Sequence, residues 1–417
     1  SNVVKVRGDV NVYLTNITYF GEVVFLGEKA SLTFTNDVEF TAYGNGFKFR
    51  DLTLNFNGTF NFHSKTIFEN CFINTDTRLD SYFYEVSLYK TSFTGQYLPL
   101  TVSNIYSYES YISINLLTIQ DNMYINNTNL ILQSTSPVLF NTFAVGTIQN
   151  STLSISTNTK FTTPNVNLNN NYITVNSPGR LEFVPAINNI FIENNKIYYV
   201  NSGAGTTLNK TSNGLIYWDF NSSVSANNIK INNNTFTIVN LYHYPIINFR
   251  FRSLDTQSYG VNGLQINNNI FTNQSADLTQ INYQSDKQCV ISICSDVAST
   301  STTSTVAKPI LKNVEINNNY CNGNQSILLT QLKIKYNFAY CYLNPGIVAN
   351  GIIISNNTCG AIGYWVTSDS TDTVLNNNGG LTISNNSCHY IANLASDGSF
   401  VLLFDNSKFV SYMSSGF

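Results

Sequence analysis

Charged residues are scarce in this sequence, and their scarcity narrows the partners that it can recognise through electrostatics. Asp, Glu, Lys and Arg make up 11% of the 417 residues, and the formal net charge is -3 at pH 7. Nucleic-acid binding needs clustered Lys and Arg, so we expect no nucleic-acid partner. The apolar share of 43% is enough for a long core, and such a composition is not that of a disordered chain. Solubility must come from uncharged polar groups, and Asn alone is roughly one residue in seven.

Long apolar runs and metal-binding motifs are also missing. No run approaches the roughly 20 apolar residues of a membrane-spanning helix, so we expect no membrane span. The chain has only three His, and none of its Cys residues forms a Cys-x-x-Cys pair, so a zinc site is not expected. The clustered carboxylates that bind calcium are absent as well. The sequence therefore predicts no metal and no cofactor.

The seven Cys residues allow two interpretations. Cys289 and Cys294 lie in one short variable segment, while Cys321 and Cys341 flank another, so these four are candidates for disulfides in an oxidising compartment. The alternative is that several are buried thiols, because free Cys packs as a small hydrophobe. We favour burial for two further residues, Cys359 and Cys388.

A short pattern, Ile-x-Ile-Asn-Asn-Asn-x-Phe, recurs along the chain. The clearest copies are IKINNNTF, LQINNNIF and VEINNNYC, at 229–236, 264–271 and 314–321. The closest copies lie roughly 20 to 24 residues apart, and an internal period of that size indicates a solenoid. Further copies occupy 166–173, 190–197, 352–359 and 381–388.

Each part of this pattern has a physical reading. Alternating apolar residues such as Ile229 and Ile231 predict a strand with one inward face. Asn tolerates the left-handed backbone conformation, and its amide can bond to backbone groups. The third Asn of each copy is therefore expected to mark a tight bend, with stacked copies forming an Asn ladder, and the residue two positions later to point inward. These Asn residues are Asn234, Asn269, Asn319, Asn357 and Asn386.

With this repeat the sequence resembles the pectate-lyase-like superfamily of right-handed parallel β-helices. That superfamily includes polysaccharide lyases, glycoside hydrolases and phage tailspikes. The resemblance implies an all-β, single-stranded right-handed parallel β-helix forming one domain over 1–417, with its first coils in 1–60. The Ser/Thr-rich segment 298–307 is expected to be a mobile loop. Further inserted loops are expected at 253–262, 285–312, 333–350 and 367–378.

Candidate site residues lie on the strands that feed these loops, because function concentrates in loops on a rigid scaffold. Strands are expected at 181–184, 216–220, 247–251 and 361–366, and alternation divides their residues between the two faces. The residues predicted to face outward are Glu182, Tyr217, Asp219, Asn248, Arg250, Arg252 and Trp365.

Two kinds of chemistry fit this outward set. Neighbouring coils lie about 4.8 Å apart, so Glu182 and Asp219 would have about the 5 Å separation of a retaining glycosidase. The resemblance instead implies a lyase, with Arg250 or Arg252 as the base. The simpler alternative is that carboxylates beside arginines form cross-strand ion pairs. Tyr217, Asn248 and Trp365 are candidates for ligand binding, with Trp365 stacking on a sugar.

The catalytic motifs of these enzymes are largely missing. The fragment NTD at 74–76 matches one hydrolase element, but the sequence contains no Asp-Asp pair and no Gly-His-Gly. Roughly eleven Asn-x-Ser/Thr sequons suit a glycosylated surface protein. The candidates for modification are Asn16, Asn57, Asn150, Asn209, Asn221, Asn273 and Asn324.

These features favour a non-enzymatic β-helix on a cell or virion surface, outside the cytoplasm, with a structural or adhesive role. Its expected partners are glycans or other surface proteins, and it is expected to form a homo-oligomer or a filament. The alternative is a carbohydrate-active enzyme, either a polysaccharide lyase or a glycoside hydrolase, such as a tailspike-like depolymerase.

Overall fold

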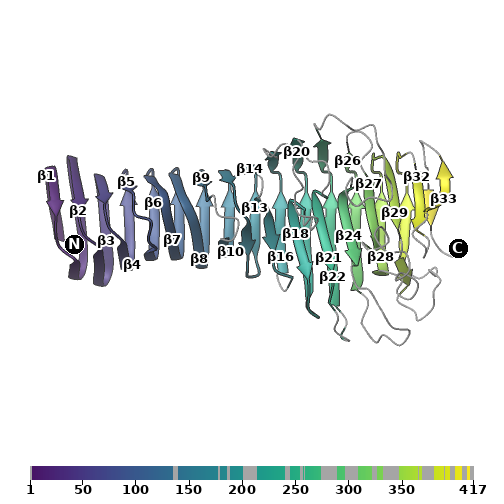
Figure 1. The fold of residues 1–417 in the computed structure, drawn as a ribbon, viewed down its shortest axis with the longest axis horizontal. Helices are drawn as coiled ribbons and strands as arrows, with labels where there is room; N and C mark the ends of the chain where they lie inside the picture. The colour runs from purple at the N-terminus through teal and green to yellow at the C-terminus, as the bar shows by residue number, and fades with distance from the viewer. Residues whose placement is uncertain are drawn as a thin grey trace. The chain divides into compact units, whose positions relative to one another are not determined.

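The computed structural model of this chain consists of β-strands and their connections (Figure 1). No helix occurs among the residues it describes, which confirms the prediction of an all-β chain. The strands divide between two compact units, unit 1 (1–162 and 166–179) and unit 2 (163–165 and 180–417). The described residues are 2–134, 140–176, 179–185, 188–200, 214–239, 245–253, 257, 259–273, 289–295, 309–321, 326–331, 347–364, 366–368, 380–388, 390–394, 400–405 and 411–413.

The strands of unit 1 pair in parallel with strands about 20 residues further along the chain. Long strands turn a corner and pair with different neighbours along their length, as β7 does with β5 and β6. The strands are β1 (Asn2–Val12), β2 (Asn16–Phe34), β3 (Val38–Phe56), β4 (Phe60–Glu69), β5 (Phe72–Thr75), β6 (Ser81–Tyr89), β7 (Ser92–Tyr108), β8 (Tyr111–Asn126), β9 (Asn129–Leu132), β10 (Asn141–Gln149), β11 (Thr152–Ile155), β12 (Thr159–Phe161), β13 (Val166–Asn169) and β14 (Tyr172–Asn176).

In unit 2 the strands form three series of parallel pairs. The series begin with β15, β16 and β17, which pair with β18, β19 and β20. Among the described residues, the antiparallel pairs are β32 with β33 and β31 with β34. The strands are β15 (Leu181–Phe183), β16 (Asn188–Glu193), β17 (Lys196–Val200), β18 (Ile216–Phe220), β19 (Ser225–Asn232), β20 (Thr235–Val239), β21 (Ile247–Phe251), β22 (Tyr259–Asn267), β23 (Ile270–Asn273), β24 (Cys289–Ser295), β25 (Pro309–Asn317), β26 (Tyr320–Cys321), β27 (Ser326–Gln331), β28 (Ile347–Ser355), β29 (Ala361–Tyr364), β30 (Val366–Ser368), β31 (Leu381–Ser384), β32 (Tyr390–Leu394), β33 (Phe400–Asp405) and β34 (Ser411–Met413).

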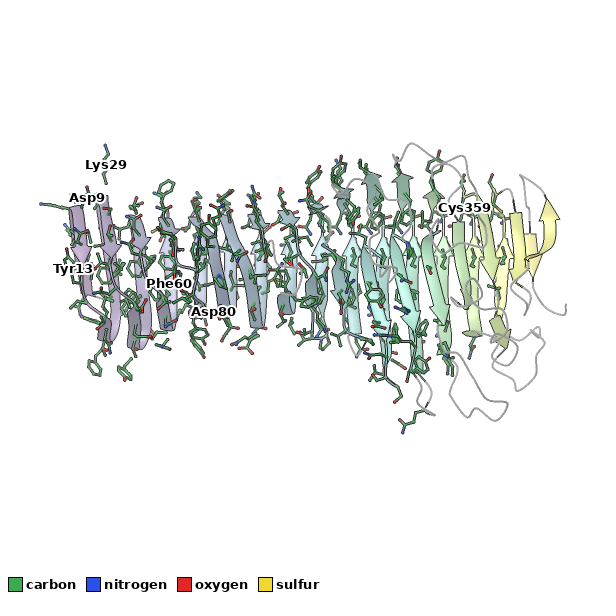
Figure 2. The ribbon with its side chains drawn as sticks, viewed as in Figure 1. Asp9, Tyr13, Lys29, Phe60, Asp80 and Cys359 are labelled. Atoms are coloured by element: carbon green, nitrogen blue, oxygen red, sulfur yellow. The ribbon has the colours of Figure 1, made fainter. Side chains whose placement is uncertain are left out.

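Inward-facing side chains stack on the equivalent side chains of the next strand in each unit. In unit 1 the rings of Phe40 and Phe62 stack with centroids 4.0 Å apart, and Phe60 is also fully buried (Figure 2). In unit 2 Trp218 and Phe249 stack at 4.4 Å. Such columns bury large aromatic areas and fix the register of the strands.

The Asn clusters form sharp corners in unit 2, as the repeat predicts, but the roles of the neighbouring Asn residues differ. The left-handed residue is the one before the predicted position: Asn233, Asn268 and Asn318 have φ between 57° and 58°. The predicted residues themselves are buried and form the ladder. The prediction that the third Asn makes the bend is therefore off by one residue, because the bend needs backbone freedom and the ladder needs a buried amide.

The Asn ladder itself is confirmed. The side-chain amide of each member donates to the amide oxygen of the next at 3.0 Å. That oxygen also accepts the backbone N–H of the donor residue at 2.9 to 3.0 Å. The ladder runs through Asn195, Asn234, Asn269, Asn319, Asn357 and Asn386. The predicted inward position is also confirmed, since Phe236, Phe271, Cys321, Cys359 and Cys388 are all buried.

Unit 1 has the same corner with different side chains. Non-glycine residues with positive φ, such as Lys90 and Glu109, directly precede the buried Thr91 and Ser110. Lys29 at an earlier corner projects away from the ribbon (Figure 2). Hydroxyls replace the amide: the backbone N–H of Cys71 donates to Thr91 Oγ1 at 3.3 Å, and that of Thr91 donates to Ser110 Oγ at 3.1 Å. The corner geometry therefore does not depend on Asn alone.

Other predictions are corrected in unit 2. Strand β24 contains both Cys289 and Cys294, so about 16 Å of extended chain separates their Cα atoms. A disulfide needs less than about 7 Å, so a Cys289–Cys294 bridge is wrong. Cys321 is a free buried thiol, so its predicted disulfide is wrong too, and Cys341 lies outside the described residues. The burial of Cys359 and Cys388 is confirmed.

The predicted loops are partly strand. The segment expected at 253–262 overlaps β22, and the one expected at 285–312 contains β24 and the start of β25. The Ser/Thr-rich segment 298–307 lies outside the described residues. The strands expected at 216–220 and 247–251 are confirmed as β18 and β21.

Candidate functional site

The predicted cluster of unit 2 lies on β15, β18 and β21, and two of its members are not open to solvent. Tyr217 is 2% exposed and Asn248 is 3% exposed, so the prediction that they face solvent is wrong. They do lie beside the charged groups of the outward face, since Asp219 and Arg250 both act on the pKa of Tyr217. Burial is the main cause that raises the pKa of Tyr217 to about 12, so the phenol keeps its proton at neutral pH.

The two carboxylates of this cluster do not form a facing pair. Glu182 lies opposite Tyr217 in the register of β15 and β18, whereas Asp219 lies two residues further along. The Glu182 carboxylate accepts from the Arg180 guanidinium at 2.9 Å. Asp219 forms an ion pair with Arg252. The cross-strand ion pair is therefore confirmed for Asp219 only, because Glu182 pairs with Arg180, two residues earlier in the chain. The predicted facing of the two carboxylates is wrong.

Some of the remaining predicted site residues are exposed, and others lie outside the described residues. Asn16, Asn57 and Asn221 are exposed, as glycosylation requires. Asn150 is exposed too, but its amide nitrogen donates to Asn126 Oδ1 at 3.0 Å, a bond that an attached glycan would displace. The remaining candidates, Trp365, Asn209, Asn324 and the side chain of Asn273, lie outside the described residues.

A shallow groove of about 480 Å³ crosses the outward face of β3, β4, β6 and β7 in unit 1. Its lining combines tyrosine rings with charged groups. Tyr89 and Tyr108 occupy equivalent positions on β6 and β7, and their rings stack in parallel with centroids 5.1 Å apart. The lining residues are Lys48, Ile67, Glu69, Tyr89, Lys90, Tyr108 and Glu109.

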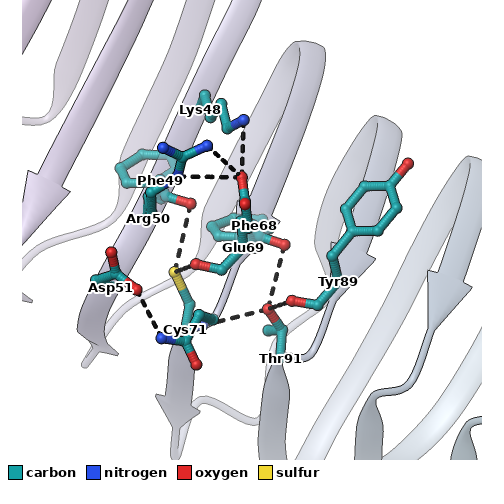
Figure 3. Close-up of polar contacts among 10 residues, drawn as sticks. Lys48, Phe49, Arg50, Asp51, Phe68, Glu69, Cys71, Tyr89 and Thr91 are labelled. Carbon is teal, nitrogen blue, oxygen red and sulfur yellow. Dashed lines mark hydrogen bonds and ion pairs between the residues drawn. The ribbon is translucent and has the colours of Figure 1, made fainter.

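Glu69 anchors the charged end of this groove (Figure 3). Its Oε2 accepts from Lys48 Nζ and from Arg50 Nη2, each at 2.8 Å. Hydrogen bonds from Lys48 and Arg50 lower the pKa of Glu69 and outweigh the opposing effect of burial. Lys48, Arg50 and Glu69 thus gather charged groups at this end of the groove that can form hydrogen bonds with polar ligands.

Thr91, at the corner that follows Tyr89, contacts the backbone of this tyrosine (Figure 3). Thr91 Oγ1 lies 3.0 Å from the carbonyl oxygen of Tyr89 and 3.2 Å from that of Phe68. Burial raises the pKa of Tyr108, and the neighbouring Tyr89, Tyr124 and Tyr106 raise it further. Tyr108 is therefore a protonated phenol at neutral pH, able to donate and accept hydrogen bonds.

Sequence reasoning missed this groove because it followed the inserted loops of unit 2. A signal was present: Tyr89, Tyr108 and Tyr124 recur at intervals of one coil on outward positions of their strands. The three rings form a continuous row, with Tyr108 and Tyr124 at 5.4 Å. A column of one residue type on an exposed face can be found from the period alone.

A second groove, of about 350 Å³, lies on unit 2 along the bends within β19, β22, β25 and β28. Gly263 and Gly351 have φ of 74° and 76° and alternate there with Asn228 and Asn313, so the missing side chains leave the gaps. Along its floor Gln265 donates to Glu315 Oε2 at 3.3 Å. This groove offers amides and charges but no aromatic lining residue.

No group of three or more His, Cys, Asp or Glu side chains that could hold a metal ion occurs in the described part of the chain. Nor does that part contain a helix long and apolar enough to cross a membrane. No protein-family model, no curated protein and no solved structure matches this chain.

Proposed function

We propose that this chain is a right-handed parallel β-helix on an extracellular, cell or virion surface, with a structural and adhesive role in which it binds glycans. Repeated parallel pairing of each repeat strand with the strand of the next copy is what successive coils produce. Connections between parallel strands are right-handed in about 98% of cases, which supports the handedness. Few charges and exposed sequon residues such as Asn16 and Asn57 support a location outside the cytoplasm.

The observation that carries the glycan proposal is the tyrosine-lined groove of unit 1. Tyr89 is 40% exposed, and a tyrosine offers a flat apolar ring for the C–H faces of a sugar and a phenol for its hydroxyls. The charged groups around Glu69 supply hydrogen bonds to further hydroxyls. A shallow open groove suits binding along a chain rather than enclosure of a small substrate.

The test is binding of the full chain to a soluble glycan panel, with release of reducing ends and unsaturated uronates recorded on the same samples. We expect binding that falls roughly tenfold on Tyr89→Ala together with Tyr108→Ala, and no change for Tyr13→Ala, which is also highly exposed (68%). If the double variant Tyr89→Ala, Tyr108→Ala binds as well as the wild type, this site is refuted. Product release that disappears on Glu182→Gln or Asp219→Asn would instead establish the enzyme alternative.

We also propose that the chain forms homo-oligomers or filaments, since the flat faces of stacked coils can pack against those of another copy. Light scattering after size-exclusion chromatography measures this directly. A monomer at all concentrations would remove self-assembly from the proposal and leave glycan binding untouched.

A further inference from the structure

A second surface of unit 1 carries no charged residue in two outward columns between β5 and β14. It is formed by β5, the first residues of β7 and β8, and then β9, β11 and β14, which pair in that order. One column of outward positions runs through Phe72, Ser92, Tyr111, Asn129, Thr152 and Tyr172. The next outward column, from Asn74 to Thr174, contains only Asn, Thr, Ser and Ile. We call these two columns the neutral face.

The neutral face and the tyrosine groove use different segments of the same long strands. On β7 the face includes Ser92 and Thr94, whereas the groove uses Tyr108 at the other end. Lys90 and Glu109, which have positive φ at the corners, line the end of the groove and mark its boundary with the neutral face along the chain. Charges on the strand segments of the groove and their absence from the neutral face indicate different ligands.

Three aromatic rings stand out from the neutral face. Phe72 is 60% exposed, Tyr111 38% and Tyr172 47%. The positions between them hold the smaller side chains Ser92, Asn129 and Thr152, so each ring stands above its neighbours. The three exposed rings share one register column, so they line up along a straight path across the strands.

The spacing of the rings is set by the strands. Phe72 and Tyr111 are two strand spacings apart, about 10 Å, and Tyr111 and Tyr172 three, about 14 Å. Each sugar of an extended β-1,4-linked chain advances by close to one such spacing. A straight glycan lying across the strands would thus place every third or second sugar over a ring without bending.

We propose that the neutral face binds an extended, uncharged β-1,4-linked polysaccharide, with Phe72, Tyr111 and Tyr172 as stacking platforms. The ring faces contact the axial C–H groups of the sugars, and the hydroxyls of Ser92 and Thr152 bond to sugar hydroxyls. An anionic polymer is disfavoured, because the face offers no cation to compensate a carboxylate that loses water. This proposal concerns a surface other than the tyrosine groove and does not depend on that groove binding anything.

The experiment measures depletion of the full chain from solution by powdered cellulose and chitin, with alginate and pectate gels as anionic probes. We expect binding to a neutral powder that persists at high NaCl concentration, since charge plays no part. The triple variant Phe72→Ala, Tyr111→Ala, Tyr172→Ala should lower the partition coefficient roughly tenfold or more. Tyr111→Phe keeps the ring and should keep binding.

Two controls separate this surface from others. Phe20→Ala with Tyr43→Ala removes a pair of rings that are 79% and 63% exposed elsewhere in unit 1, and it should change the partition less than twofold. Tyr89→Ala with Tyr108→Ala tests the groove and should leave powder binding unchanged even where it abolishes binding of soluble glycans. All substituted residues are outward-facing, so circular dichroism should show an unaltered strand signal.

Four results would overturn the proposal: no partition to either neutral powder, equal partition of the triple variant and the wild type, loss of binding at high salt, or preference for the anionic gels. A wild-type dimer that the triple variant converts to monomer, without powder binding, would assign the face to a second copy of the chain instead.

Discussion

Removing one amide from the buried ladder should destabilise unit 2 far more than removing the amide beside it. In Asn319→Ala the side chain loses its bonds to Asn357 Oδ1 at 3.0 Å and to the Ile266 carbonyl oxygen at 2.7 Å. It also loses the oxygen that accepts both the backbone and the side-chain N–H of Asn269 at 3.0 Å. Asn319 is 1% exposed, so water cannot replace these bonds.

The magnitude follows from the bond count. A hydrogen bond contributes about 1 kcal/mol net, and a buried group left unpaired costs about 1 to 3 kcal/mol. The loss of this side chain should therefore lower the free energy of unfolding by about 4 kcal/mol. Asn319→Thr should lose about half as much, because Thr91 and Ser110 serve the equivalent position in unit 1.

The neighbouring residue supplies the matched control. Asn318 is exposed and has φ of 57°, so Asn318→Gly keeps the corner and should change stability by less than about 1 kcal/mol. Urea unfolding followed by circular dichroism measures all three variants. A loss below about 1 kcal/mol for Asn319→Ala, or an equal loss for Asn318→Gly, would refute the ladder as a source of stability.

Three further predictions concern the corners, the charged groove and the buried thiols. At the exposed corner residue Asn127, whose φ is 48°, Asn127→Val should cost about 1 to 2 kcal/mol in urea unfolding while Asn127→Gly is nearly neutral; equal effects would contradict a left-handed corner. The pKa of Glu69 is lowered by Lys48 and Arg50, so its contribution to stability is present above the unfolded pKa of about 4.3 and is lost as pH falls through the folded pKa. Glu69→Gln should therefore flatten the decline of the free energy of unfolding with falling pH slightly, by well under 1 kcal/mol at this partly exposed site, and an unchanged acid profile in urea unfolding would refute the pairing. Burial raises the pKa of Cys388 to about 11 and that of Cys359 well above its usual range, so both should escape iodoacetamide at pH 8 until urea unfolds the chain; peptide mass spectrometry showing labelling of the native protein would contradict their burial.

Some features of the candidate sites could be predicted from a few neighbouring residues, and others depend on how strands pair. The residues of the unit 2 cluster were found from alternation along single strands, which is a local property. Which of these residues face one another could not be found in this way. The register of β15 and β18 decides it, and it places Glu182 opposite Tyr217 rather than opposite Asp219. The tyrosine row was visible in the sequence as a period, but its groove exists only where neighbouring strands place Lys48 and Glu69 beside it.

By itself the sequence determined the all-β class, the inward faces of the repeat strands and the corners to within one residue, because these depend on alternation and on Asn residues a few positions apart. The copies IKINNNTF and LQINNNIF carried both the strand and its bend. Only the tertiary structure decided which Asn turns left-handed and which joins the ladder, and that Cys321 is a free thiol. Those outcomes depend on what lies on the next strand, roughly 20 to 50 residues away in the chain, where hydrogen-bond partners and burial are set by register rather than by neighbouring sequence.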